Sequence, residues 1–166
     1  MDAHAQNAFS FSITTFDGQQ HSLGQYQGKR VLLVVIPSTY TSSDSDFLRN
    51  MDTVAMDYQD SITVIGIPSY EDGYYDDSLY SLKAYYGDLV LSPCIIAEGM
   101  DTRKASAYQD PLFGWLTNQS QNGHFDEDVK GVGEMYFIDP QGNLYGVFGP
   151  EQALNGALME QMMQMH

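Results

Sequence analysis

Alternating and continuous apolar runs along the chain predict a series of strands and helices. Residues 9–14 alternate apolar and polar side chains, the period of a half-buried strand, and Asp17-Gly18 supplies the turn of a hairpin. The apolar runs at 31–36 and 61–67 each precede a proline and fit strands that are covered on both faces. We expect these two strands to lie parallel in one central sheet, joined by a right-handed crossover.

Apolar residues at helical spacing occupy much of the remaining chain. The predicted helices cover 47–58, 78–86, 111–116 and 151–165. On the last of these helices, five residues share the predicted buried face: Leu154, Ala157, Leu158, Met162 and Met165. Met159 and Met163 lie off that face, where a partner can reach them. Segments 133–139 and 144–148 flank a Pro-Gln-Gly-Asn turn and predict an antiparallel β-hairpin.

Length and composition favour one domain with its own core. The chain has 166 residues, of which 43% are hydrophobic, so we expect a single domain over 1–166 with its core at about 9–163. Lys and Arg number 7 against 22 Asp and Glu, and the resulting net charge of −15 repels nucleic acid and anionic lipid. No apolar run reaches the roughly 18 residues of a membrane helix. The expected partner is therefore a protein or another copy of the chain, without nucleic acid and without membrane insertion.

The start of the chain carries neither a basic nor an apolar leader, so a cytoplasmic protein is the default expectation. Ala3-His4-Ala5 looks like the small-residue end of a cleavage site, and the acidic composition fits export. A periplasmic or secreted protein whose signal has been removed is the alternative.

Cys94 is the single cysteine of the chain. One thiol excludes an intrachain disulfide, a thiolate metal cage and the Cys-x-x-Cys type of redox pair. Ile95 and Ile96 follow Cys94, and a thiol in apolar surroundings has a raised pKa and stays inert. We interpret Cys94 as a core residue, with a reactive nucleophile as the alternative.

Three separated segments of the chain resemble the glutathione peroxidase family. They are residues 16–34, residues 111–116 (PLFGWL) and residues 137–142 (FIDPQG). The resemblance spans about residues 9 to 163 and implies an α/β protein of thioredoxin-like fold. In that fold a central mixed β-sheet is flanked by helices, and here an N-terminal β-hairpin is added. The resemblance also implies peroxide reduction, an oxidative-stress activity, by a cysteine or selenocysteine near the start of the first long helix.

The catalytic residues of that family have no counterpart in this chain. The family's nucleophile lies in a motif like A-S-x-C-G-x-T, and the matching segment places Tyr40 at its position. The family's glutamine corresponds to Glu71, and its tryptophan and asparagine, in a W-N-F motif, correspond to Gly131 and Val132. A phenol with a pKa near 10 offers no populated anion at neutral pH. We therefore predict that none of these four positions is catalytic, and we expect no cofactor and no metal.

Two functions are compatible with these residues. The favoured hypothesis is a catalytically silent pseudoenzyme that binds a protein partner or copies of itself. Its binding residues would be Tyr40, in the former active-site cleft, and the tyrosines of an acidic loop: Tyr70, Tyr74, Tyr75 and Tyr80. The alternative is a thiol-dependent peroxidase that uses Cys94 as its nucleophile with an external thiol as the resolving partner.

Two acidic clusters, at 71–77 and 126–128, also invite a functional interpretation. Calcium accepts carboxylate oxygens, but the alternating Asp-x-Asp-x-Asp-Gly spacing of a calcium loop is absent from both. We interpret the clusters as solvated loops and leave calcium binding open. The four histidines are scattered and receive no role.

Overall fold

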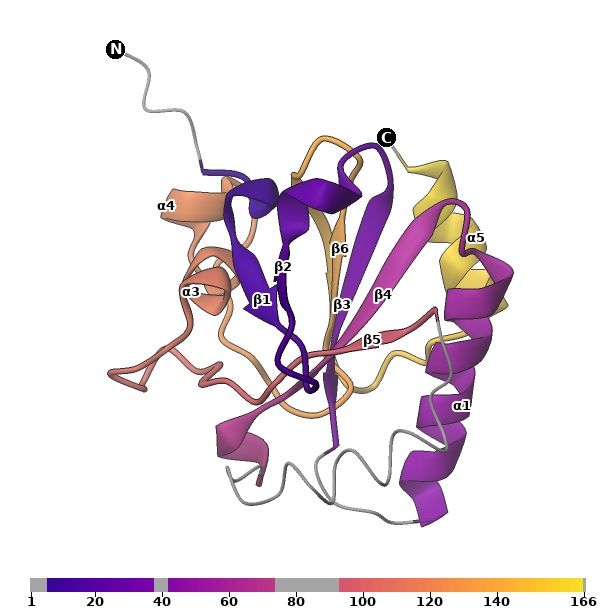
Figure 1. Ribbon diagram of the computed structural model, residues 1–166, viewed down its shortest axis with the longest axis horizontal. Coiled ribbons are helices and arrows are strands. Elements are labelled where there is room, and N and C mark those ends of the chain that lie inside the picture. The colour runs from indigo at the N-terminus through magenta and orange to yellow at the C-terminus, as the bar shows by residue number, and fades with distance from the viewer. Residues whose placement is uncertain (1–5, 38–41, 74–92, 166) are drawn as a thin grey trace.

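A mixed five-stranded sheet forms the centre of the protein (Figure 1). The computed structural model describes residues 6–37, 42–73 and 93–165. The strand order is β5-β4-β3-β6-β7, with the bounds Ile95–Ile96, Ile62–Pro68, Arg30–Ile36, Met135–Ile138 and Leu144–Phe148. β3 pairs with β4 in parallel and with β6 antiparallel, which confirms the predicted pairing of the two apolar runs in one sheet.

Both predicted hairpins are confirmed. β6 pairs antiparallel with β7, and β1 (Ser12–Thr14) pairs antiparallel with β2 (Gln20–Ser22) in a separate two-stranded sheet. β1 is shorter than the strand that the alternation at 9–14 predicted. Residues Ala8–Ser10 instead form a short 3-10 helix, η1, in which the Asn7 side chain accepts a hydrogen bond from the Phe9 amide.

Helices cover the two faces of the central sheet. α1 (Ser42–Asp57) and α5 (Gly156–Gln164) cover one face, and α3 (Pro111–Thr117) covers the other, with the short α4 (Gln119–Asn122) following it (Figure 1). Alternate residues of β3 feed the two cores, because Leu32, Val34 and Ile36 pack under α1 and α5 whereas the residues between them face α3. The predicted helix at 78–86 lies outside the described residues. No described helix combines the length and the apolarity that a membrane crossing requires.

The C-terminal helix begins five residues later than predicted. The Asn155 side chain accepts a hydrogen bond from the Leu158 amide and caps α5, so residues 151–155 precede the helix. Ala157, expected on the buried face, is exposed. Met159, expected off that face, is 0% exposed, whereas Met165, expected on it, is 42% exposed. The prediction was wrong at these two methionines because the helical face had been counted through residues that lie outside the helix.

Candidate functional site

Three strand ends meet at one edge of the central sheet, next to Glu71 and Val132. β3 and β4 are parallel, so their carboxyl ends at Ile36 and Pro68 share this edge, and β6, which is antiparallel to β3, begins there. Two backbone hydrogen bonds join the strand ends: Gly133 donates to the Val35 carbonyl at 2.7 Å, and Val35 donates to the Glu134 carbonyl at 3.0 Å. Tyr40, the position of the family's nucleophile, lies outside the described residues.

Glu71 lies in the 3-10 helix η3 (Tyr70–Asp72), directly after β4. Its carboxylate accepts hydrogen bonds from the Thr102 amide at 3.0 Å, from the Arg103 amide at 3.0 Å and from the Ser69 hydroxyl at 3.0 Å. Burial acts to raise the pKa of Glu71, but these hydrogen bonds together outweigh it and hold the pKa below its ordinary value. Glu71 therefore fastens the segment after β4 to residues 102–103 and has its oxygens occupied by protein donors.

Replacing Glu71 by Gln should destabilise the protein by about 1 kcal/mol at pH 7, because a partly exposed carboxylate loses charge-assisted hydrogen bonds. A carboxylate whose pKa is lowered by folding contributes stability above its unfolded pKa of about 4.3, and that contribution disappears as the pH falls through the folded pKa. The difference between Glu71→Gln and wild type should therefore shrink between pH 7 and pH 3 in urea denaturation. Glu160→Gln, at an exposed position of α5, is the matched control. A pH-independent difference would contradict this assignment.

The segment before β6 carries Gly131 and Val132, the positions that were expected to correspond to the tryptophan and asparagine of glutathione peroxidases. Gly131 has φ +157° and Gly133 has φ +97°, backbone conformations that favour glycine. Neither a glycine hydrogen nor a valine side chain can donate a hydrogen bond to a reacting oxygen. Backbone amides aside, the donors that the family supplies from this segment are absent here.

Glu134 is the buried carboxyl of this edge, with only 1% of its surface exposed. It accepts a hydrogen bond from the Lys130 amide, and its neighbour on the same face of β6 is Tyr136, also 1% exposed. Burial raises the pKa of Glu134, and the hydrogen bond from Lys130 opposes that shift only in part. Burial also raises the pKa of the Tyr136 hydroxyl, and the Glu134 carboxylate adds to the effect. The Glu134 carboxylate would not stabilise a thiolate beside it, because the two charges have the same sign.

Glu134→Gln should stabilise the folded protein at pH 7 by about 1 kcal/mol, because it removes the cost of a buried charge and keeps an oxygen for the Lys130 amide. A carboxyl whose pKa is raised by folding contributes its stability fully below the unfolded pKa of about 4.3 and loses it as the pH rises through the folded pKa. The advantage of the variant should therefore vanish near pH 4. Thermal unfolding at the two pH values measures this. A variant less stable than wild type at pH 7 would show that the charge is compensated.

Cys94 lies just before β5 and packs against the hydrophobic core under α1. It borders a small cavity together with Phe16, His21 and Ile96. Burial raises the pKa of the Cys94 thiol to about 12, and the nearby Asp52 carboxylate raises it further. At that pKa only about one thiol in 10⁵ is ionised at pH 7. Cys94 thus lacks the electropositive setting of reactive cysteines.

Of the five tyrosines predicted to bind a partner, Tyr70 alone falls within the described residues. It is partly buried and packs against the hydrophobic core under α1 and α5. Tyr74, Tyr75 and Tyr80 lie outside the part of the chain that the structure describes.

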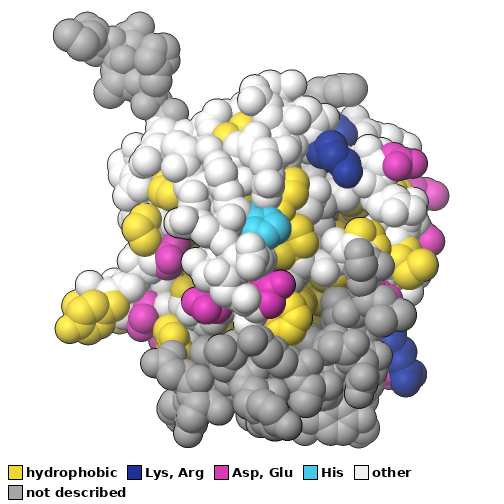
Figure 2. Space-filling view, viewed as in Figure 1, with side chains coloured by type: hydrophobic (Ala, Val, Ile, Leu, Met, Phe, Trp, Pro, Cys, Tyr) yellow, Lys and Arg dark blue, Asp and Glu magenta, His cyan; other side chains and the backbone are white. Residues whose placement is uncertain are grey.

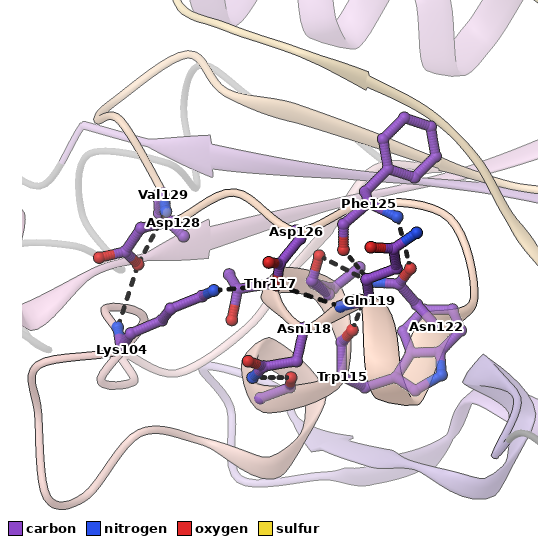
Figure 3. Close-up of polar contacts among 12 residues, drawn as sticks. Lys104, Trp115, Thr117, Asn118, Gln119, Asn122, Phe125, Asp126, Asp128 and Val129 are labelled. Carbon is purple, nitrogen blue, oxygen red and sulfur yellow. Dashed lines mark hydrogen bonds and ion pairs between the residues drawn. The ribbon is translucent and has the colours of Figure 1, made fainter.

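The acidic cluster at 126–128 is held by protein donors rather than arranged around an ion (Figure 3). The Lys104 side chain reaches Asp126 at 3.3 Å, and the Lys104 amide donates to Asp128 at 3.0 Å. Asp126 also accepts from the Gln119 amide, which ties this loop to the start of α4. Across the described ranges, no three His, Cys, Asp or Glu side chains are placed to hold a metal ion.

The structure adds two charged residues that the sequence patterns did not single out. One is Glu134, a buried carboxyl directly before the apolar run of β6. A charged residue next to a buried strand is the sequence feature that could have indicated it. The other is Arg103, which pairs with Asp72 at 2.9 Å and donates to the Thr102 hydroxyl. Figure 2 shows acidic side chains beside hydrophobic ones on the face that carries β1 and β2.

Comparison with solved structures places this architecture in the class of thioredoxin-like proteins. The apo form of Trgpx matches with a TM-score of 0.71 and 19% identity over 96% of this chain and 95% of that one. A thioredoxin family thiol:disulfide interchange protein from Chlorobium tepidum matches with a TM-score of 0.64 and 21% identity over 99% and 98% of the two chains. The predicted thioredoxin-like fold is confirmed.

Within this class, the chain is similar to glutathione peroxidase homologues. The protein named glutathione peroxidase homolog BsaA from Staphylococcus epidermidis is 26% identical over 156 residues, covering 89% of this chain and 91% of the relative. Its Staphylococcus aureus counterpart is 26% identical over 153 residues, with the same coverage. No family model matches the chain. The resemblance to glutathione peroxidases that the three sequence segments indicated is confirmed.

Proposed function

We propose that the protein is a catalytically silent relative of glutathione peroxidases that acts by binding another protein. The observation that carries this proposal is the state of Cys94: the single thiol of the chain is packed against the core, with a pKa raised to about 12. A peroxidase of this kind needs a thiolate that attacks the O–O bond, because the thiol form is a poor nucleophile. Cys94 is partly exposed beside a small cavity, but its thiol lacks the ionisation that this step requires.

The other positions support the same proposal. Glu71 is bound by the backbone of residues 102–103, and Gly131 and Val132 bring no side-chain donor to the sheet edge. Among the described residues, a substrate peroxide at this edge would find the carboxylates of Glu71 and Glu134, neither of which accepts an oxygen atom from peroxide and returns to its starting state. What persists is the scaffold, whose surfaces remain available for binding.

A steady-state assay of peroxide consumption tests the proposal. Wild type and Cys94→Ser are compared with hydrogen peroxide and cumene hydroperoxide, with either glutathione or thioredoxin as the reductant. We expect both proteins to consume peroxide at the rate of the reductant alone. Turnover by wild type that Cys94→Ser abolishes would instead establish the thiol-dependent peroxidase, and turnover retained by Cys94→Ser would place the chemistry outside the thiol.

A further inference from the structure

Two adjoining cavities lie between α1 and the segment that precedes α5. The larger has a volume of about 420 Å³ and extends to Val132 and Gly133, and the smaller has a volume of about 220 Å³. Asn50 and Leu154 line both cavities, so the two are neighbours, and together they are here called the α1–154 groove. The groove therefore runs from the sheet edge described above along the side of α1.

The α1–154 groove combines an apolar floor with polar walls. Phe47, Val54 and Leu154 contribute apolar surface, and Val54 and Leu154 are only 4% and 3% exposed. Asn50 and Gln152 place amide groups along the walls, although the Gln152 nitrogen already donates to the Ala153 carbonyl at 3.1 Å. An apolar floor with adjacent amides suits a peptide, whose side chains fill the depression while its backbone hydrogen-bonds to the amides.

The charges of the groove have a single sign. Asp57 lines the smaller cavity and Glu151 the larger one, and neither cavity has Lys or Arg in its lining. The ion pairs within the described part of the chain involve Asp72, Asp126 and Glu127, so Asp57 and Glu151 are free of such a pairing there. Two unneutralised carboxylates beside an apolar floor favour a cationic occupant.

The dimensions of α1 set the length of that occupant. The ten helical steps from Phe47 to Asp57 span about 15 Å at 1.5 Å per residue. An extended chain advances about 3.3 Å per residue, so about five residues cover this length. A second copy of this chain is a poor occupant, since two chains of net charge −15 repel each other.

We propose that the α1–154 groove binds an extended segment of a protein partner, about five residues long, with apolar side chains and Lys or Arg near its two ends. The proposal rests on the binding role proposed above and gives that role a location and a partner chemistry. It assigns Asp57 and Glu151 to the cationic ends and the apolar floor to the residues between them.

Fluorescence anisotropy with a dye-labelled acetyl-Lys-Leu-Ser-Leu-Lys-amide peptide tests the proposal, and the peptide with Glu in place of both Lys is the probe control. We expect the basic peptide to bind and the acidic peptide not to bind. Amide chemical-shift changes in the wild-type NMR spectrum locate the site without any substitution. They should concentrate at residues 47–57 and 150–156.

Three variants separate the groove from the general acidity of the chain. Asp57→Asn with Glu151→Gln should weaken binding of the basic peptide about fivefold to tenfold, since two exposed pairs are lost. Ala153→Trp, at an exposed position in the lining of the larger cavity, keeps the charge and should abolish binding by filling the cavity. Glu127→Gln with Glu160→Gln removes the same charge elsewhere and should leave binding within about twofold. Circular dichroism confirms that each variant is folded.

Equal weakening in both charge variants, or unchanged binding in Ala153→Trp, would overturn the proposal in favour of diffuse electrostatic attraction. Absence of binding to wild type, or equal binding of the acidic peptide, would also overturn it. None of these outcomes bears on peroxide turnover, so the groove can fail while the non-catalytic role stands.

Discussion

Tyr40→Cys alone should react with hydrogen peroxide at a second-order rate within about tenfold of that of free cysteine. The substitution restores a thiol two residues before α1, where a helix N-terminus lowers a thiol pKa. It does not restore the donors that the resemblance places in the family at the positions of Glu71, Gly131 and Val132. Hydrogen-bond donors that act in a transition state are each worth about 10²–10³ in rate in other enzymes.

Stopped-flow measurement at neutral pH decides this prediction. Adding Val132→Asn to Tyr40→Cys returns one side-chain donor without disturbing Gly131, and it should raise the rate above that of the single variant. If Tyr40→Cys by itself reacts thousands of times faster than free cysteine, the assignment of the supporting positions is wrong. Tyr40→Ser, which restores a small polar side chain without a thiol, is the matched control.

Cys94 in the wild-type protein should react with iodoacetamide at pH 7 at least about a hundredfold more slowly than free cysteine. Its pKa, raised to about 12 by burial and by Asp52, lowers the thiolate fraction by more than three orders of magnitude relative to a free thiol of pKa about 8.5. The greater intrinsic nucleophilicity of a more basic thiolate offsets about half of that loss on a logarithmic scale. Packing against the core slows access further.

Mass spectrometry of the alkylated protein as a function of pH measures the Cys94 reaction. The same protein in concentrated urea is the control, because unfolding removes both burial and the neighbouring carboxylate and should return the rate to that of free cysteine. Asp52→Asn should give a smaller increase, since burial is the larger cause. A folded-state rate equal to that of free cysteine would contradict the buried environment assigned to the thiol.

The sequence pattern predicts the sheet well because its central strands are nearly continuous apolar runs. β3 and β4 are apolar over almost their whole length and lie buried in the middle of the sheet, so no competing period obscures them. The C-terminal helix shows the opposite case. Leu154 is buried, as a residue on the inner face of the helix would be, but it lies before the helix. The helix begins after Asn155, whose side chain caps it through one local hydrogen bond.

The candidate site is less predictable because its contacts join residues that are far apart in the chain. Glu71 is bound by residues 102–103, which lie 31 and 32 positions later. The alignment of Glu71 with the family's glutamine gives no indication that its carboxylate accepts hydrogen bonds from these backbone amides. The α1–154 groove likewise forms where α1 lies beside a segment about 100 positions further along the chain, so no local sequence motif predicts it.

The proposal that the protein lacks a peroxide-reducing nucleophile is tested most directly by the peroxide consumed in a single exposure, without any reductant. Wild-type protein is mixed with a small excess of hydrogen peroxide. The peroxide consumed after a few seconds is expressed as moles per mole of protein. The account predicts no loss beyond that of a protein-free blank, because no thiolate is populated to attack. Rapid loss of about one peroxide per chain, absent in Cys94→Ser, would contradict it whichever reductant the protein uses.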